Sequence, residues 1–173
     1  MPTTMKLIAK NVLGSSASSV TFSSIPGTGY TDLRLISSAR TNRGNNGDSM
    51  YLNFNGDTTS SNYSNRILYG TGSSVASITE ARGICLTQGA CGNSDTANTF
   101  GSSDAYIPNY AGSTAKSVSH QGNSETNAAT SYMSIDAGLW VGTAAISSLV
   151  ITPGNGSQFL SGSSFFLYGI TKA

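Results

Sequence analysis

Apolar and polar residues alternate along several short stretches of this chain, which is the pattern of β-strands with two different faces. In residues 49–55 the alternation assigns Met50 and Leu52 to an inward face and Tyr51 and Asn53 to an outward face. The turn dipeptide Asn-Gly ends the stretch. This segment is the clearest strand that the sequence predicts.

The same alternation recurs in residues 130–138, where Met133 and Ile135 fall on one face and Ser134 and Asp136 on the other. Further strands are expected at residues 6–13, 19–23, 32–40, 74–86, 99–107 and 116–120, with either a strand or a short helical turn at 62–70. Eight to ten short strands at such spacing predict an all-β protein, folded as one β-sandwich or jelly-roll domain over residues 1–173.

The end of the chain, residues 147–171, predicts two strands around a turn at residues 153–156. The second of these strands is apolar on both faces, whereas a sandwich core needs only one of them. The extra face is formed by Phe166, Tyr168 and Ile170. We therefore expect another element of the chain or a neighbouring subunit to cover these three side chains, which makes them the candidate assembly interface.

Composition supports strands and turns over helices. Ser, Thr, Asn and Gly make up nearly half of the chain, and all four disfavour helix interiors. A net charge of +1 with scattered basic residues gives no basis for nucleic-acid binding. No apolar run approaches the roughly 18 residues of a membrane span, and the N-terminus lacks the apolar segment of a signal peptide. Synthesis in a cytoplasm is expected, with neither nucleic acid nor membrane as a partner.

The sequence contains no recognisable catalytic motif. His120 is the single histidine, and no Gly-x-Ser-x-Gly nucleophile elbow accompanies it, so a hydrogen-bonded or exposed strand histidine is expected. Cys85, Cys91 and His120 lack the spacing of a zinc site. The oxygen-rich loops 45–48 and 55–57 lack the ligand period of a calcium loop and are interpreted as turns. No cofactor, no metal and no enzymatic activity are expected, although two carboxylates at a glycosidase separation stay an alternative.

Cys85 and Cys91 are separated by only five residues, and they are the only cysteines in the chain. We expect the two thiols to lie close together, on or beside one loop. A cytoplasm would keep them reduced, as partly buried thiols, whereas a later oxidising medium would allow a disulfide that closes a small loop.

Aromatic residues recur among small polar ones. The set comprises Tyr30, Tyr51, Tyr63, Tyr69, Tyr106, Tyr110, Tyr132 and Trp140. Such residues suit contact surfaces for protein or sugar. The alternative interpretation is that most of them cap the ends of the core with their hydroxyl groups in water.

Six patches are spread over the chain, at residues 5–10, 51–57, 62–66, 68–70, 106–112 and 165–170. Together they resemble small virion structural proteins of tailed bacteriophages, especially of aquatic and cyanobacterial phages. The resemblance implies a β-sandwich or jelly-roll fold, no enzymatic activity and assembly on a particle, often as trimers. It carries no functional residue to this chain.

Under this resemblance the protein is expected to be a capsid decoration (cement) protein, located in the virion. It would bind the major capsid protein or other virion proteins, as a homo-oligomer with a trimer favoured. The alternative is a tail-fibre or receptor-binding module that contacts host polysaccharide through outward Tyr, Trp and Asn residues. A glycan depolymerase domain is a third hypothesis.

Overall fold

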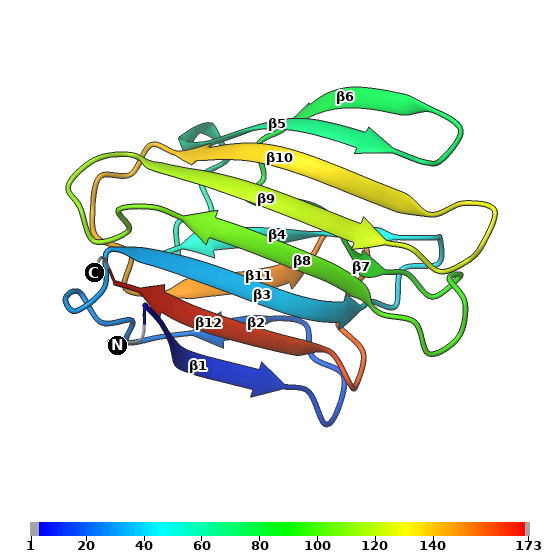
Figure 1. Cartoon of the computed structure of the whole chain (residues 1–173), viewed down its shortest axis with the longest axis horizontal. Helices are drawn as coiled ribbons and strands as arrows, with labels where there is room; N and C mark the ends of the chain where they lie inside the picture. The colour runs from blue at the N-terminus through cyan, green and yellow to red at the C-terminus, as the bar shows by residue number, and fades with distance from the viewer. Residues whose placement is uncertain (1–3, 172–173) are drawn as a thin grey trace.

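The computed structural model describes residues 4–171, which form twelve β-strands and one turn of 3₁₀ helix. The strands are β1 (Met5–Val12), β2 (Val20–Phe22), β3 (Asp32–Arg40), β4 (Asp48–Phe54), β5 (Tyr63–Gly70), β6 (Val75–Glu80), β7 (Ile84–Cys91), β8 (Gly101–Ile107), β9 (Lys116–Ser124), β10 (Tyr132–Trp140), β11 (Leu149–Pro153) and β12 (Ser164–Ile170) (Figure 1). The 3₁₀ turn, Ser60–Asn62, directly precedes β5. Residues 4–171 contain no helix that is long and apolar enough to cross a membrane.

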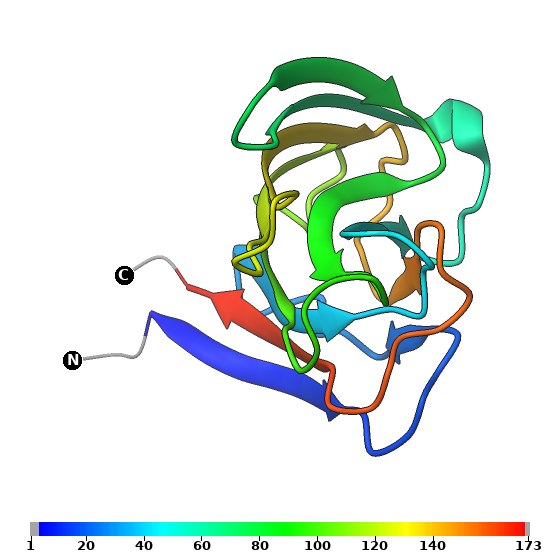
Figure 2. The same cartoon turned by 90° about the vertical axis from the view of Figure 1, so that its right-hand side faces the viewer.

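The strands form two layers (Figure 2). The larger layer is antiparallel throughout, in the order β1-β12-β3-β8-β9-β10-β5-β6. The smaller layer has the order β2-β11-β4-β7. A short parallel pairing of β3 with β7, at Ala39/Ala90 and Arg40/Cys91, joins the layers at one end. The predicted all-β sandwich is confirmed.

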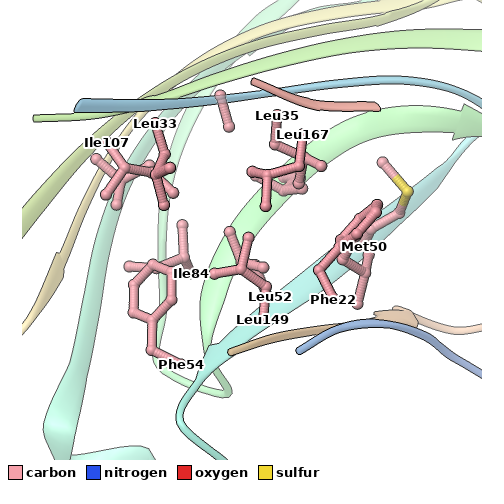
Figure 3. Packing of buried hydrophobic residues seen from close by; sticks show 14 of the residues in the cluster. Phe22, Leu33, Leu35, Met50, Leu52, Phe54, Ile84, Ile107, Leu149 and Leu167 are labelled. Carbon is pink, nitrogen blue, oxygen red and sulfur yellow. The ribbon is translucent and has the colours of Figure 1, made fainter. Parts of the chain in front are cut away.

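The main core lies between the two layers. Leu33 and Leu35 of β3 are fully buried, as are Met50 and Leu52 of β4, and Figure 3 shows them within one cluster. Burial of a side chain of this size stabilises the fold by about 1.5–3 kcal/mol. The inward face predicted for residues 49–55 is therefore confirmed.

The outward face predicted for the same strand is wrong. Tyr51 and Asn53 are only 5% and 9% exposed. Tyr51 packs in a second small cluster with Ile67 and Cys85, and its hydroxyl donates to Glu80 Oε2 at 2.9 Å. Strand β4 is covered on both faces because the end of the larger layer folds over it.

The strand count also exceeds the expected eight to ten. Residues 74–86, predicted as one strand, hold β6 and the start of β7, with a reversal between them. Of the two alternatives expected for residues 62–70, the strand is correct: β5 begins at Tyr63, and the 3₁₀ turn Ser60–Asn62 precedes it. Strand β9 extends four residues beyond the predicted 116–120.

Candidate docking surface and buried polar cluster

In its first half, residues 133–136, strand β10 turns its apolar side chains to solvent and its polar side chains to the core. Met133 and Ile135 are 60% and 59% exposed, whereas Ser134 and Asp136 are buried at 3% and 4% exposure. The pattern of residues 130–138 identified a two-faced strand correctly. Its apolar face, however, lies on the outside of the sandwich.

The cause is the backbone of β7, which packs against β10. The pairing of β4 with β7 shifts register between Asp48 and Met50, and Gln88 has a φ of 51°. Both backbone polar groups of Thr87 therefore bond to side chains of β10. The N–H donates to Asp136 Oδ2 at 2.9 Å, and the carbonyl accepts from Ser134 Oγ at 2.6 Å. Buried peptide groups need such partners, so polar residues occupy the inward positions of β10.

Ser103, His120 and Asp136 form a hydrogen-bonded chain across the neighbouring strands β8, β9 and β10. His120 Nδ1 lies 2.5 Å from Asp136 Oδ2, and His120 Nε2 lies 2.9 Å from Ser103 Oγ. The Asp136 carboxylate accepts from Nδ1, and Nε2 and the Ser103 hydroxyl are hydrogen-bonded to each other. No local pattern in the sequence predicts this arrangement, because its members are 17 and 16 residues apart along the chain.

The order serine, histidine, aspartate is also that of a hydrolase triad. Here Ser103 is 1% exposed, and β7 packs directly over it: a Cβ built on Gly89 would meet Ser103 Cβ at 2.9 Å. A substrate carbonyl has no space to approach the hydroxyl. The chain of hydrogen bonds joins three strands inside the core, in agreement with the expectation of a hydrogen-bonded strand histidine.

An exposed apolar patch lies on the outer face of β10, β5 and β6. It consists of Leu68, Val75, Met133 and Ile135, with Leu68 half exposed and Val75 73% exposed. Register brings them together, because Ile135 pairs with Leu68, and Gly70 lies between Met133 and Val75. The side chains also line a shallow hollow with little polar surface. Contiguous exposed apolar surface is a feature of interaction sites, which makes this patch a candidate docking site.

Phe166, Tyr168 and Ile170 lie on the same outer face, at its opposite end. All three are half-buried, because neighbouring side chains of β1 and β3 shield their flanks. Figure 2 shows no further layer of residues 4–171 outside the larger layer. The described chain therefore does not cover this face, and cover by a neighbouring subunit stays a prediction.

Between these two apolar areas the outer face is polar. Arg34 Nε donates to both carboxylate oxygens of Asp104, at 2.9 and 3.1 Å, and Nη2 donates to Oδ2. The hydrogen bonds to Asp104 raise the pKa of the Arg34 guanidinium. Arg34, Asp104, Tyr106 and Gln121 line a shallow depression, in which Tyr106 is 38% exposed.

Cys85 and Cys91 do not share a loop. They lie at opposite ends of β7, both buried and both free thiols. Six residues of extended strand span roughly 20 Å, whereas a disulfide needs Cα atoms about 4.4–6.8 Å apart. Burial raises the pKa of Cys85 to about 12 and also raises the pKa of Cys91. The prediction of neighbouring thiols, and with it a small-loop disulfide, is wrong.

Half of the eight aromatic residues in the set singled out from the sequence are core residues. Tyr51, Tyr63, Tyr110 and Trp140 are buried, and Trp140 Nε1 donates to Asp57 Oδ2 at 2.8 Å. The buried tyrosine hydroxyls bond to protein acceptors, for example to the carbonyls of Asp57 and Pro26. The expectation that these tyrosines place their hydroxyl groups in water is therefore wrong. The expectation that Trp140 faces outward is wrong as well.

The two oxygen-rich loops act as turns, as expected. The Asp48 carboxylate accepts hydrogen bonds from Thr41 Oγ1 and from the backbone N–H groups of Asn155 and Gly156. Among residues 4–171, no group of three or more His, Cys, Asp or Glu side chains is placed to hold a metal ion.

The outer face of the larger layer is the candidate docking surface of this chain. It combines apolar ends with a polar centre and no covering element from residues 4–171. Comparison with protein families and with curated proteins finds no family model and no curated protein that matches the chain.

Proposed function

We propose that this protein is a virion structural protein of a tailed bacteriophage, acting as a capsid decoration (cement) protein that reinforces the head shell. It docks on the major capsid protein through the outer face of the eight-stranded layer. The observation that carries this function is the reversed polarity of β10, which leaves Met133 and Ile135 about 60% exposed. The resemblance of the sequence to phage virion proteins supplies the identity of the partner.

The dimensions of the face suit such a contact. Eight strands spaced by about 4.8 Å form a surface about 34 Å wide. A stable protein interface buries about 800 Å² on each partner, and strands of seven to nine residues provide enough length for that area. An apolar centre with a polar surround is the usual arrangement at such interfaces. The patch of Leu68, Val75, Met133 and Ile135, bordered by Asn123 and Gln121, has this arrangement.

Assembly of the protein with itself uses the other end of the face. Phe166, Tyr168 and Ile170 form the contact between subunits of a homo-oligomer, for which the resemblance favours a trimer. Their half-buried state in one chain supports this assignment, since apolar side chains in that condition gain from a neighbour.

The experiment that tests this function counts the copies of the protein bound to each phage head. Heads lacking the protein are incubated with wild-type or variant chain, purified and quantified on a protein gel. A cement protein fills the lattice, with copies in the hundreds. Ile135→Glu places a charge within the patch and is expected to lower occupancy at least tenfold. The matched control is Ser60→Glu, which adds the same charge at an exposed position of the 3₁₀ turn, outside the eight-stranded layer. Full occupancy by Ile135→Glu contradicts docking through this face.

A receptor-binding role in a tail or fibre is the second candidate, and the depression around Arg34, Asp104 and Tyr106 favours it. A paired guanidinium and carboxylate beside an exposed aromatic ring offers hydrogen bonds and a stacking face, which are the contacts that sugars use. This role predicts tens of copies per virion at most and binding to host polysaccharide that Tyr106→Ala abolishes. Unchanged binding by that variant, or no binding by wild type, excludes it.

A further inference from the structure

The eight-stranded layer ends in two edge strands that differ in how well they are protected against pairing with a further strand. Strand β1 pairs only with β12, and β6 pairs only with β5 among the described residues. Figure 1 shows β6 at the upper margin of the molecule with no element beyond it. An unprotected edge is a template for a further strand, so natural proteins usually block their edges with lysines, prolines, bulges or very short strands.

Strand β1 carries such protection. It presents exposed Lys6 and Lys10, and its pairing with β12 shifts register between Leu7 and Ala9. The edge of the smaller layer, β2, is only three residues long. Both features discourage the addition of another strand.

Strand β6 carries none of these devices. Its sequence, Val-Ala-Ser-Ile-Thr-Glu, contains no proline, glycine or lysine, and it pairs with β5 in one unbroken register. Val75 is 73% exposed and Ile78 is 45% exposed, on opposite faces of the strand. A regular edge strand rich in β-branched residues and exposed on both faces is suited to pairing.

The hairpin geometry identifies the free backbone groups. Thr71 N–H donates to the Ser74 carbonyl at 3.0 Å, so residues 71 and 74 are a hydrogen-bonded pair at the turn. Hydrogen-bonded and non-hydrogen-bonded pairs alternate in an antiparallel ladder. Following the register, Ile78 bonds to β5, whereas Ser77 and Thr79 direct their peptide groups to the open edge.

We propose that β6 is a self-pairing edge, at which β6 strands of two copies of this chain join antiparallel about a twofold axis, with Ile78 opposite Ile78. In this register Ser77 of one copy exchanges backbone hydrogen bonds with Thr79 of the other. The two Ile78 side chains then form the intervening non-hydrogen-bonded pair, in which side chains approach most closely. Both lie on the face of Ile67, so each covers the half-exposed isoleucine of the other.

Charge permits this pairing. The single ionisable residue of β6 is Glu80, which falls opposite Ala76 of the second copy. Its carboxylate already accepts hydrogen bonds from Arg82 and Tyr51 of its own chain. No two like charges face each other across the axis.

The area that the two β6 strands bury sets the affinity of the dimer. Six residues span about 20 Å of strand, so the contact is smaller than the roughly 1,200 Å² that stable complexes bury. The dimer is therefore weak in free solution. A lattice that holds many copies side by side raises the effective concentration of one β6 strand near another and so favours the contact. A twofold contact at β6 and a threefold contact at β12 use different ends of the layer, so both fit in one assembly.

Cysteine cross-linking tests the register. In the paired state the Cα atoms of the two residues 78 are about 4.5 Å apart, within the range of about 4.4–6.8 Å that a disulfide requires. Ile78→Cys, at high concentration with oxidised glutathione as oxidant, is expected to give a covalent dimer on a non-reducing gel. Val75→Cys is the matched control, because position 75 is more exposed but lies far from its copy in this register. Faster cross-linking of Val75→Cys indicates random collision and overturns the pairing.

A second variant tests the edge without a new thiol. Ser77→Pro removes an N–H that faces the open edge, so the hairpin with β5 is expected to remain. Wild type is expected to show a concentration-dependent dimer in sedimentation up to about 1 mM, and Ser77→Pro is expected to lose the β6-dependent step with an unchanged circular dichroism spectrum. An association in Ser77→Pro equal to that of wild type, or no dimer in wild type, refutes self-pairing at β6. The result is independent of capsid docking, which uses the outer face.

Discussion

Ile135 and Asp136 are consecutive residues of β10 that point in opposite directions, with 59% of Ile135 exposed and only 4% of Asp136. The carboxylate turns inward because it serves two buried donors, the Thr87 N–H and His120 Nδ1. The isoleucine is thereby left on the outer face. Strand β10 is bonded to the core through Ser134 and Asp136, and Met133 and Ile135 are exposed.

The first prediction concerns the buried side of this relationship. Asp136→Ala leaves the Thr87 N–H and His120 Nδ1 without an acceptor in a buried site. Each buried donor left without an acceptor costs about 1–3 kcal/mol, so the loss of two such bonds should lower the urea midpoint steeply. Asp104→Ala is the control, because its pair with Arg34 is partly exposed and such pairs contribute at most about 1 kcal/mol. Equal losses in the two variants contradict this assignment.

The second prediction concerns the exposed side. Ile135→Ala should change the free energy of unfolding by less than about 1 kcal/mol, the span of strand propensity at a surface site. The same change at Ile67, which is 2% exposed on neighbouring β5, should cost about 2–5 kcal/mol. Chemical denaturation of both variants makes the comparison. A larger loss at Ile135 than at Ile67 would place the apolar face inside the molecule.

The sequence predicted the strands well and the orientation of β10 poorly, for the same physical reason. Alternation reports that two faces differ, as at Met50/Leu52 and at Met133/Ile135, but it does not report which face is covered. In β4 the apolar face meets the core, whereas in β10 an irregular stretch of β7 demands polar partners. The Thr87–Asp136 hydrogen bond joins residues 49 apart in the chain, and no local pattern encodes it.

The cysteines show the limit of spacing as evidence. A five-residue gap suits a small loop, but it suits opposite ends of one strand equally well, and β7 is that strand. The bifacial pattern of residues 165–170 correctly predicted the strand β12 with apolar side chains on both faces, whereas the assembly role of its outer face, Phe166, Tyr168 and Ile170, stays a prediction. What covers that face depends on other molecules, which one sequence does not contain.

The third prediction follows from the buried thiols. Burial raises the pKa of both Cys85 and Cys91, and the thiolate is the reactive form. In native protein at pH 8, neither cysteine is expected to react appreciably with an aromatic disulfide reagent, whereas two thiols per chain should react in urea. Rapid native labelling of either residue, or fewer than two thiols in urea, would contradict the structure of β7.

The fourth prediction separates the two faces of β12. Phe165 is fully buried and packs edge-on against Phe159, with ring centroids 5.0 Å apart, so Phe165→Ser should cost at least about 3 kcal/mol. Phe166 is half-buried on the outer face. Phe166→Ser should retain the fold but lose oligomerisation in sedimentation. If Phe166→Ser forms the wild-type oligomer, this face is not the subunit contact.

The last prediction is a pH dependence of stability set by Asp57. Its carboxylate accepts hydrogen bonds from Trp140 Nε1, Asn62 Nδ2 and the Thr59 N–H, at 2.8, 2.8 and 2.9 Å. These bonds, that from Trp140 foremost, lower the pKa of Asp57 from 3.8 to about 2. A carboxyl whose pKa is lower in the folded state contributes full stability above its unfolded pKa and loses it as pH falls towards the folded value.

The loss due to Asp57 is therefore expected between about pH 4 and pH 2. Thermal midpoints measured across this range should fall less steeply for Asp57→Asn than for wild type, since the amide does not titrate. Glu80 contributes in the same range, because hydrogen bonds from Arg82, Ala81 and Tyr51 outweigh the effect of burial and lower its pKa to about 2. Asp57→Asn should thus flatten the curve only in part, and Asp57→Asn/Glu80→Gln should flatten it further. Identical slopes for wild type and the double variant would show that neither carboxylate is stabilised in the folded state.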